Sequence, residues 1–105
     1  MAKPATWDAK PKKLIYNGVL HEFFTRTHLA MALNRESGTI RSWELKGVVC
    51  HPLVRDKRGS WLYTREQVEA LVRLAKEEGV FDPRFRNQFS QRFSEEAHRI
   101  LNAEP

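Results

Sequence analysis

Two adjacent side chains, Arg41 and Ser42, have the types that suit recognition of base edges in duplex DNA. An arginine can pair with the O6 and N7 atoms of guanine through two parallel hydrogen bonds, and a serine is short enough to let a helix approach a base closely. Both residues lie in the stretch GTIRSWELKGVV, residues 38–49. Such contacts require an exposed helix, so the surrounding pattern decides the interpretation.

The segment that begins near Ser37 and ends at Gly47 is predicted to be a helix with two different faces. On a wheel of about 100° per residue, Trp43 and Glu44 fall within about 60° of Ile40. Ile40 and Trp43 are therefore predicted to be core residues. Glu44 would repel phosphate if it faced DNA, so we expect it to form an internal ion pair or hydrogen bond that joins the helix to the following hairpin. The opposite side carries Gly38, Arg41, Ser42 and Leu45.

A shorter helix is predicted just before this one. Thr25 can cap it, and Asn34 tolerates the left-handed conformation that ends helices. Its apolar residues recur at helical spacing and are Leu29, Ala30 and Leu33. Because only a few residues separate the two helices, the pattern predicts a helix-turn-helix.

The N-terminal part is predicted to contain an arm and a hairpin. Residues 1–13 include two prolines and four lysines without a hydrophobic period, which indicates a basic, extended or disordered arm, with Trp7 either docked on the domain or exposed. The β-prone runs Leu14–Tyr16 and Val19–Phe23 flank Asn17-Gly18. This dipeptide suits a type I′ turn, so we expect a small hairpin.

A second hairpin and a third helix are predicted after Gly47. The runs Leu53–Arg55 and Ser60–Tyr63 flank the basic turn DKRG, residues 56–59. Thr64 and Gln67 then form a capping box at the start of a helix that Gly79 ends. Its apolar stripe consists of Val68, Leu71, Val72 and Ala75. Helix, turn, helix, hairpin and helix in this order predict a winged helix-turn-helix in residues 14–79, which is mainly α with small β-hairpins (α+β).

Residues 80–105 are predicted to form a helical extension. Asp82-Pro83 suits a helix start, and Ser94 could cap a final segment. One face of the extension gathers Phe85, Phe89, Phe93, Ala97 and Ile100. An apolar face of this size must be covered, so it packs on the chain's own domain, on a second copy or on another protein.

The motifs between residues 24 and 76, taken in order, resemble the DNA-binding domain of MerR-type regulators and the related excisionase-like proteins. The resemblance to the family's first helix rests on Thr25, Leu29 and Ala30. The resemblance to its recognition segment, TIRxWExxG, rests on Thr39, Ile40, Arg41, Trp43, Glu44 and Gly47. The resemblance to the end of its wing, GYRLYT, rests on Gly59, Leu62, Tyr63 and Thr64. It implies a winged helix-turn-helix that binds double-stranded DNA.

The chain departs from the family pattern at three points. Glu36 stands where the family has a small polar cap, so either Glu36 or Ser37 starts the recognition helix. Trp61 replaces an arginine of the wing, so a phosphate contact there would pass to Arg55, Lys57 or Arg58. The long dimerising helix and effector domain of full-length family members are not recognised in the sequence, and no small-molecule effector is expected.

The positive charge of the chain is concentrated in the same region. Residues 24–63 hold seven Lys or Arg and three Asp or Glu, which gives +4 of the chain's net charge of +5. Lysines and arginines near a recognition helix supply phosphate contacts, which position a protein on DNA. Thr39 either contacts a phosphate or caps the helix locally. The candidate DNA-contacting residues are Arg35, Ser37, Thr39, Arg41, Ser42, Lys46, Arg55, Lys57 and Arg58.

Other classes of protein receive little support from the sequence. The single cysteine, Cys50, excludes an intramolecular disulfide and suits a reducing cytoplasm. Neither a membrane span nor a signal peptide is recognised in the 105 residues. Cys50 and the four histidines lack zinc-site spacing, and no nucleophile motif or glycine-rich phosphate loop occurs, so neither an enzyme nor a cofactor or metal is expected.

The sequence therefore predicts a small DNA-binding protein of the bacterial or phage-infected cell, associated with the nucleoid. Its first expected role is sequence-specific transcriptional control. An accessory role in phage recombination or DNA packaging, as in an excisionase or a small terminase subunit, and a protein-interaction adaptor remain as alternatives. One such module reads few base pairs, so a homo-oligomer or a cooperative assembly on DNA is expected.

Overall fold

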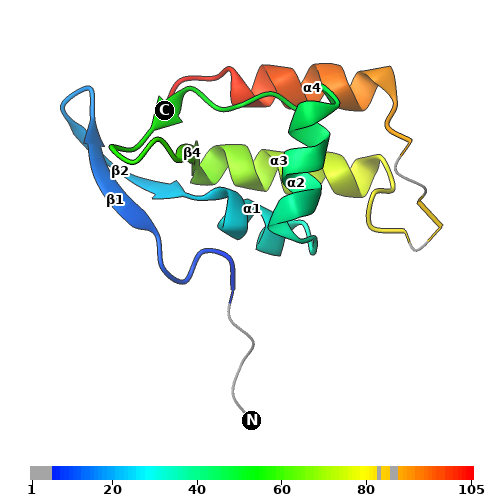
Figure 1. The fold of residues 1–105 in the computed structure, drawn as a ribbon, viewed down its shortest axis with the longest axis horizontal. Helices are drawn as coiled ribbons and strands as arrows, with labels where there is room; N and C mark the ends of the chain where they lie inside the picture. Colours follow the sequence, from blue (N-terminus) through cyan, green and yellow to red (C-terminus); the bar gives the residue numbers. More distant parts are fainter. Residues whose placement is uncertain (1–5, 83, 86–87) are drawn as a thin grey trace, which may run out of the picture.

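In the computed structural model, which describes residues 6–82, 84–85 and 88–105, two β-hairpins join into one antiparallel sheet beside four helices (Figure 1). The strands are β1 (Lys12–Tyr16), β2 (Val19–Phe24), β3 (Val54–Arg55) and β4 (Trp61–Thr64). The helices are α1 (Arg26–Ala32), α2 (Ser37–Leu45), α3 (Arg65–Glu77) and α4 (Gln91–Leu101). The predicted α+β winged helix is confirmed.

The two hairpins meet in the middle of the sheet, whose strand order is β1-β2-β4-β3. In the first hairpin, Asn17 and Gly18 have φ angles of 51° and 79°. Positive φ at both central residues is typical of the predicted type I′ turn. β1 begins at Lys12, so residues 12 and 13 belong to the sheet and not to the arm. Pairing of Phe24 with Tyr63 ties the first hairpin to the second, which is the wing.

The described part of the N-terminal arm lies against the domain, whereas residues 1–5 lie outside the described residues. The Trp7 ring contacts the Phe24 ring edge to face, with centroids 4.7 Å apart. Next to it, the Arg65 guanidinium lies 2.9 Å from the Asp8 carboxylate. An aromatic contact with the core and an ion pair to α3 therefore hold this segment in place.

Helices α1 and α3 begin with the side-chain caps that their sequences predict. The Thr25 and Thr64 hydroxyls each accept a backbone hydrogen bond in a capping box, with His28 and Gln67 as the reciprocal partners. Helix α2 differs, because Glu36 is its N-cap and makes no capping hydrogen bond through its side chain. Its first turn is therefore held by packing rather than by a cap.

The start of α4 differs from the prediction. Ser90 caps this helix, and Ser94 lies inside it, where its hydroxyl donates to the Gly47 carbonyl oxygen over 3.3 Å. The predicted cap at Ser94 is wrong, because a serine hydroxyl within a helix can equally serve a tertiary contact. Of the predicted Asp82-Pro83 helix start, Pro83 lies outside the described residues, and Asp82 belongs to no helix.

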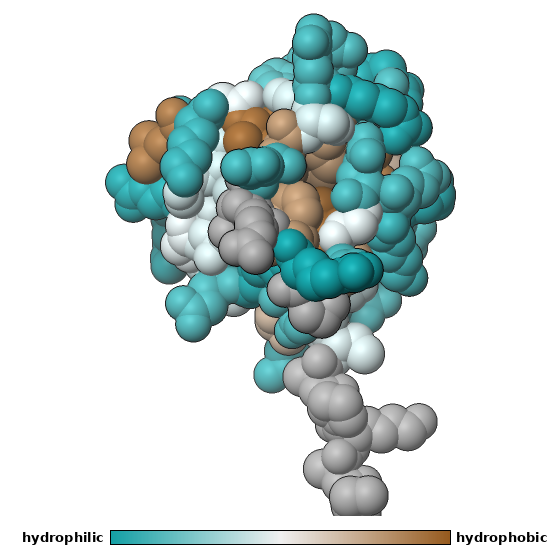
Figure 2. Space-filling model, turned by 90° about the vertical axis from the view of Figure 1, so that its right-hand side faces the viewer, coloured by the Kyte–Doolittle hydropathy of each residue, from teal (hydrophilic) through white to brown (hydrophobic). Residues whose placement is uncertain are grey.

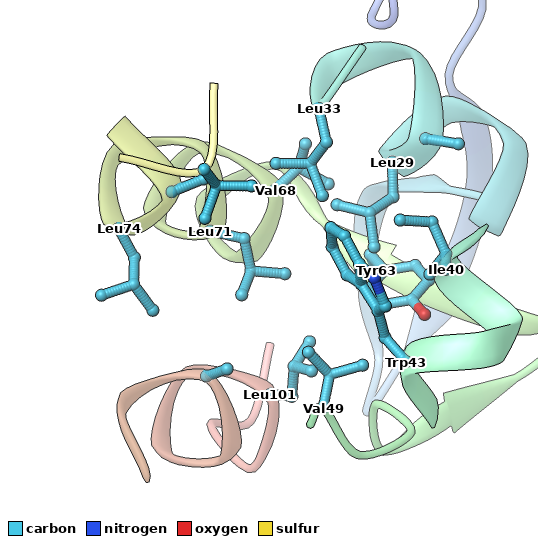
Figure 3. Close-up of a cluster of buried hydrophobic side chains, with 14 of the residues drawn as sticks. Leu29, Leu33, Ile40, Trp43, Val49, Tyr63, Val68, Leu71, Leu74 and Leu101 are labelled. Carbon is cyan, nitrogen blue, oxygen red and sulfur yellow. The ribbon is translucent and has the colours of Figure 1, made fainter. Parts of the chain in front are cut away.

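The apolar face of α4 packs on the chain's own core. Phe93, Ala97 and Leu101 are buried at helical spacing. The predicted face omitted Leu101, which is fully buried, and included Ile100, which is half-buried. Figure 3 shows Leu101 near Val49 and opposite the α3 side chain Leu71. Across the described residues, the main cluster joins all four helices and β4 and includes Leu29, Ile40, Trp43, Tyr63, Val68, Leu71, Leu74 and Phe93.

A smaller cluster lies between the two hairpins. It consists of Phe23, Val54 and Leu62, with Leu14 and Tyr16 packed at its edge. The wing is therefore supported by its own apolar contacts with the first hairpin. Separately, no described helix combines the length and the apolar character needed to span a membrane.

Replacing Leu101 by alanine should lower the free energy of unfolding by about 2–5 kcal/mol, because the side chain is fully buried and leaves a cavity. Leu45→Ala is the matched control, since Leu45 is 80% exposed and its truncation should change stability by no more than about 0.5 kcal/mol. Urea denaturation measures both. Equal effects of the two variants would contradict the packing of α4 described above.

Candidate nucleic-acid interface

Helix α2 presents one anchored face and one exposed face, as the sequence predicts. Ile40 and Trp43 are buried at 0% and 4% exposure and point toward Leu29 and Tyr63 (Figure 3). Arg41 is exposed on the opposite face, next to Leu45, which is 80% exposed. Leu45 is therefore available for contact with a partner, because the other side of the helix is anchored in the core. The candidate DNA contacts predicted from the sequence did not include Leu45.

The hydroxyl residues of α2 are half-buried. The Ser37 hydroxyl donates to the Thr27 hydroxyl of α1 over 3.3 Å. Thr39 and Ser42 line a hollow of about 340 Å³ beside α2, together with the Lys46 side chain. Three of the predicted contacts therefore share one concave surface.

The wing presents two exposed cationic side chains at its tip. Asp56 organises this turn, since its carboxylate accepts hydrogen bonds from the Arg58 and Ser60 amides over 2.9 and 2.8 Å. The Lys12 ammonium lies 2.7 Å from the same carboxylate and, with the Ser60 amide as the next contribution, holds the pKa of Asp56 below its usual value. The ordered turn leaves Lys57 and Arg58 exposed.

Two predicted phosphate contacts are engaged within the domain. The Arg35 guanidinium donates to the Val80 carbonyl oxygen over 2.7 Å and thereby ties the turn between α1 and α2 to the turn that follows α3. Arg55 lies over the Trp61 ring, 4.4 Å from its centroid, and donates to the Gly59 carbonyl oxygen. Both arginines therefore contribute to the fold of the domain.

A second hollow, of about 410 Å³, separates the wing from the beginning of α1. Its polar lining includes the hydroxyls of Thr25, Thr27 and Ser60 and the Arg58 side chain. The candidate DNA contacts predicted from the sequence omit these hydroxyl residues, because they lie in two segments that only the fold brings together. Hydroxyls beside an arginine are the donor types found at phosphate contacts.

Glu44 lies where α1, α2 and the segment before the wing meet. Its side chain is 4% exposed, and its carboxylate lies 2.7 Å from Arg26 Nε and 2.8 Å from His51 Nε2. The His51 ring stacks on Trp61 of the wing, with centroids 4.6 Å apart and an angle of 10° between the planes. The predicted internal pairing of Glu44 is confirmed, and the link to the wing runs through His51.

Tyr63 completes this buried junction. Burial, and then the nearby Glu44 carboxylate, raises the pKa of Tyr63 well above its usual value of 10. The phenol therefore stays neutral near physiological pH. With 0% exposure it serves the core and not base stacking, as expected.

Cys50 and its neighbour His51 offer no sign of catalytic pairing. Burial raises the pKa of the Cys50 thiol, which disfavours the nucleophilic thiolate, and the His51 ring is bonded to Glu44. Within the described ranges, no three His, Cys, Asp or Glu residues are grouped so that they could hold a metal ion.

Glu44→Ala should lower the free energy of unfolding by about 1–3 kcal/mol, because it removes the partner of Arg26 and His51 at a buried position. Glu36→Ala is the matched control, since Glu36 is an exposed acid of the same helix region and makes no capping bond. Its effect should stay within about 0.5 kcal/mol. Urea denaturation at neutral pH measures both, and equal stability of the two variants would refute the role of Glu44.

Comparison with known proteins agrees with this architecture. A family model described as MerR HTH family regulatory protein matches residues 24–80, which is more than half of the chain and includes α1, α2, the wing and α3. No curated protein and no solved structure matches the chain significantly. The family implies double-stranded DNA as the partner. The chain belongs to the MerR family of helix-turn-helix regulatory proteins.

Proposed function

We propose that this protein binds double-stranded DNA at preferred sequences and acts as a transcriptional regulator, with α2 in the major groove. The observation that carries the proposal is that Arg41 on α2 and the basic wing tip are both exposed, on a fold whose buried sides hold both in place. A helix of nine residues is about 13 Å long, and a major groove about 12 Å wide admits one helix.

Arg41, Ser42 and Leu45 are the proposed base-reading residues. The Arg41 guanidinium can donate two hydrogen bonds to one guanine, and the Ser42 hydroxyl can bond to several base edges. Leu45 offers an exposed apolar side chain, which suits contact with the methyl group of thymine. This set favours a site that contains guanine near thymine.

Lys57 and Arg58 are the proposed phosphate contacts of the wing. Both are exposed at a turn that Asp56 holds in shape, so they are presented with little loss of order on binding. The neighbouring hydroxyls of Thr25 and Ser60 would add donors to the same strand of DNA. Contacts of this kind fix the position of the protein but carry no sequence information.

One copy of this interface is too small for strong discrimination at cellular salt. A single module buries a limited surface and reads a few base pairs, so specific regulation requires two or more copies on neighbouring sites. The protein would therefore act as a dimer or as a cooperative assembly on repeated sites. Its copy number on DNA is measurable by footprinting with known stoichiometry.

Arg41→Ala should weaken binding to a site selected from random duplexes by about 1–3 kcal/mol and should relax specificity there, because it removes a paired contact with a base. Lys57→Ala should weaken binding to all duplexes alike and reduce the slope of log K against log salt by about one, because it removes one phosphate contact.

The charge-matched control is Arg73→Ala, which removes an exposed arginine from the α3 surface that faces α4. It should leave both specificity and the salt slope unchanged. Duplex binding measured by fluorescence anisotropy over a range of salt concentrations tests all three variants. If Arg41→Ala binds the selected site as tightly as the wild type, α2 is not the reading helix.

Leu45 makes a separate prediction about the DNA. The thymines of the selected site are replaced by uracil one at a time, which removes only the methyl group of the base. At one of these positions the replacement should weaken wild-type binding by about 1 kcal/mol, the cost of losing one buried methyl group. Leu45→Ala should bind the thymine and uracil duplexes equally. A full thymine preference in Leu45→Ala would show that another residue contacts the methyl group.

A further inference from the structure

The hollow beside α2 has a polar wall and an apolar floor. Figure 2 shows apolar residues in the middle of the face that carries the segment between α3 and α4, framed by hydrophilic residues. On the α2 side, the hollow of about 340 Å³ is lined by Glu36, Gly38, Thr39, Ser42 and Lys46. Its apolar lining comes from Trp43, Val48 and Phe89.

Neither the backbone conformation nor the packing around position 38 requires a glycine. The other four glycines of the chain have positive φ angles, which favour glycine, whereas Gly38 lies in the first turn of α2 without one. A Cβ atom added at Gly38 would meet no heavy atom within 4 Å. Since glycine disfavours a helix relative to alanine, its presence on this exposed turn suggests close approach by a partner.

Three polar side chains of the hollow are candidates to bind a ligand. Within the described part of the chain, no hydrogen bond involves the side chain of Thr39, Ser42 or Lys46. The Thr39 hydroxyl and the Lys46 ammonium are donors of the types that contact phosphate oxygens. The floor of the hollow contains the Phe89 and Trp43 rings, whose centroids lie 4.9 Å apart. Aromatic rings of this kind suit contact with the apolar face of a sugar.

We propose that this hollow holds one sugar-phosphate unit of the DNA backbone, with the phosphate at Thr39 and Lys46 and the deoxyribose against Phe89. The inference rests on the proposed DNA binding and adds a second backbone contact to it. On a wheel of about 100° per residue, Ser42 and Lys46 lie about 160° from Glu44, the residue that faces α1 and His51. The hollow and the wing therefore flank α2 on opposite sides and hold the two strands of one groove.

The bare Gly38 surface lets that sugar-phosphate unit reach the helix backbone. Gly38→Ala should therefore weaken binding to all duplexes by about tenfold, the size expected when an added methyl group must fit into a packed interface. The same variant should unfold at the same temperature as the wild type or at a higher one, because alanine favours the helix. Loss of binding without loss of stability separates contact from folding.

Lys46→Ala tests the charge of the site. It should reduce the salt slope by about one, whereas Arg73→Ala should not change it. Ethylation of single phosphates on the selected duplex should reveal one phosphate whose modification weakens the wild type and Arg73→Ala but no longer affects Lys46→Ala. A second phosphate should lose its ethylation effect in Lys57→Ala. The phosphate identified with Lys46→Ala should lie on the opposite strand from this second phosphate.

The outcomes distinguish this inference from the proposed function. A wild-type protein that binds no duplex in a salt-dependent manner overturns both. If the wild type binds duplexes, two results overturn the second backbone contact alone. One is a Gly38→Ala variant that binds as tightly as the wild type, and the other is a Lys46→Ala variant whose binding is sensitive to ethylation of the same phosphates as the wild type.

Discussion

The carboxylate of Glu44 is buried at the junction of α1, α2 and the segment that leads into the wing, and the arrangement of α2 and the wing depends on how this charge is satisfied. A buried carboxylate without a partner is costly. Arg26 and His51 must therefore stay beside it, and the stacking of His51 on Trp61 extends the constraint to the wing. One acidic residue thus fixes the recognition helix relative to both of its neighbours.

The basic residues fall into two groups, those with a partner inside the domain and those that are exposed. Arg26 pairs with Glu44, Arg35 bonds to a carbonyl at the end of α3, and Arg55 covers Trp61. Lys57 and Arg41 remain exposed. The excess of +4 in residues 24–63 therefore includes arginines that hold the fold together. The positive charge that we propose for DNA contact is smaller and lies on α2 and the wing tip.

Segments outside the matched residues 24–80 support the same interface from behind. The Phe89 ring packs on Trp43 of α2, and the Ser94 hydroxyl bonds to the Gly47 carbonyl oxygen, just after α2. The Gln67 amide donates to the Ala103 carbonyl oxygen over 3.1 Å and ties the end of α4 to α3. The C-terminal segment therefore stabilises the position of α2 and also packs on the core.

The sequence by itself determined the features that act within about one turn of chain. The capping box of Thr64 and Gln67, the left-handed Asn34 and the two faces of α2 each depend on neighbouring residues, so local patterns predict them. Only the tertiary structure decided that Arg26, eighteen positions away, pairs with Glu44, and that Arg35 is engaged by Val80. These pairings depend on which elements meet in space, and a charge in a sequence carries no mark of the partner that will neutralise it.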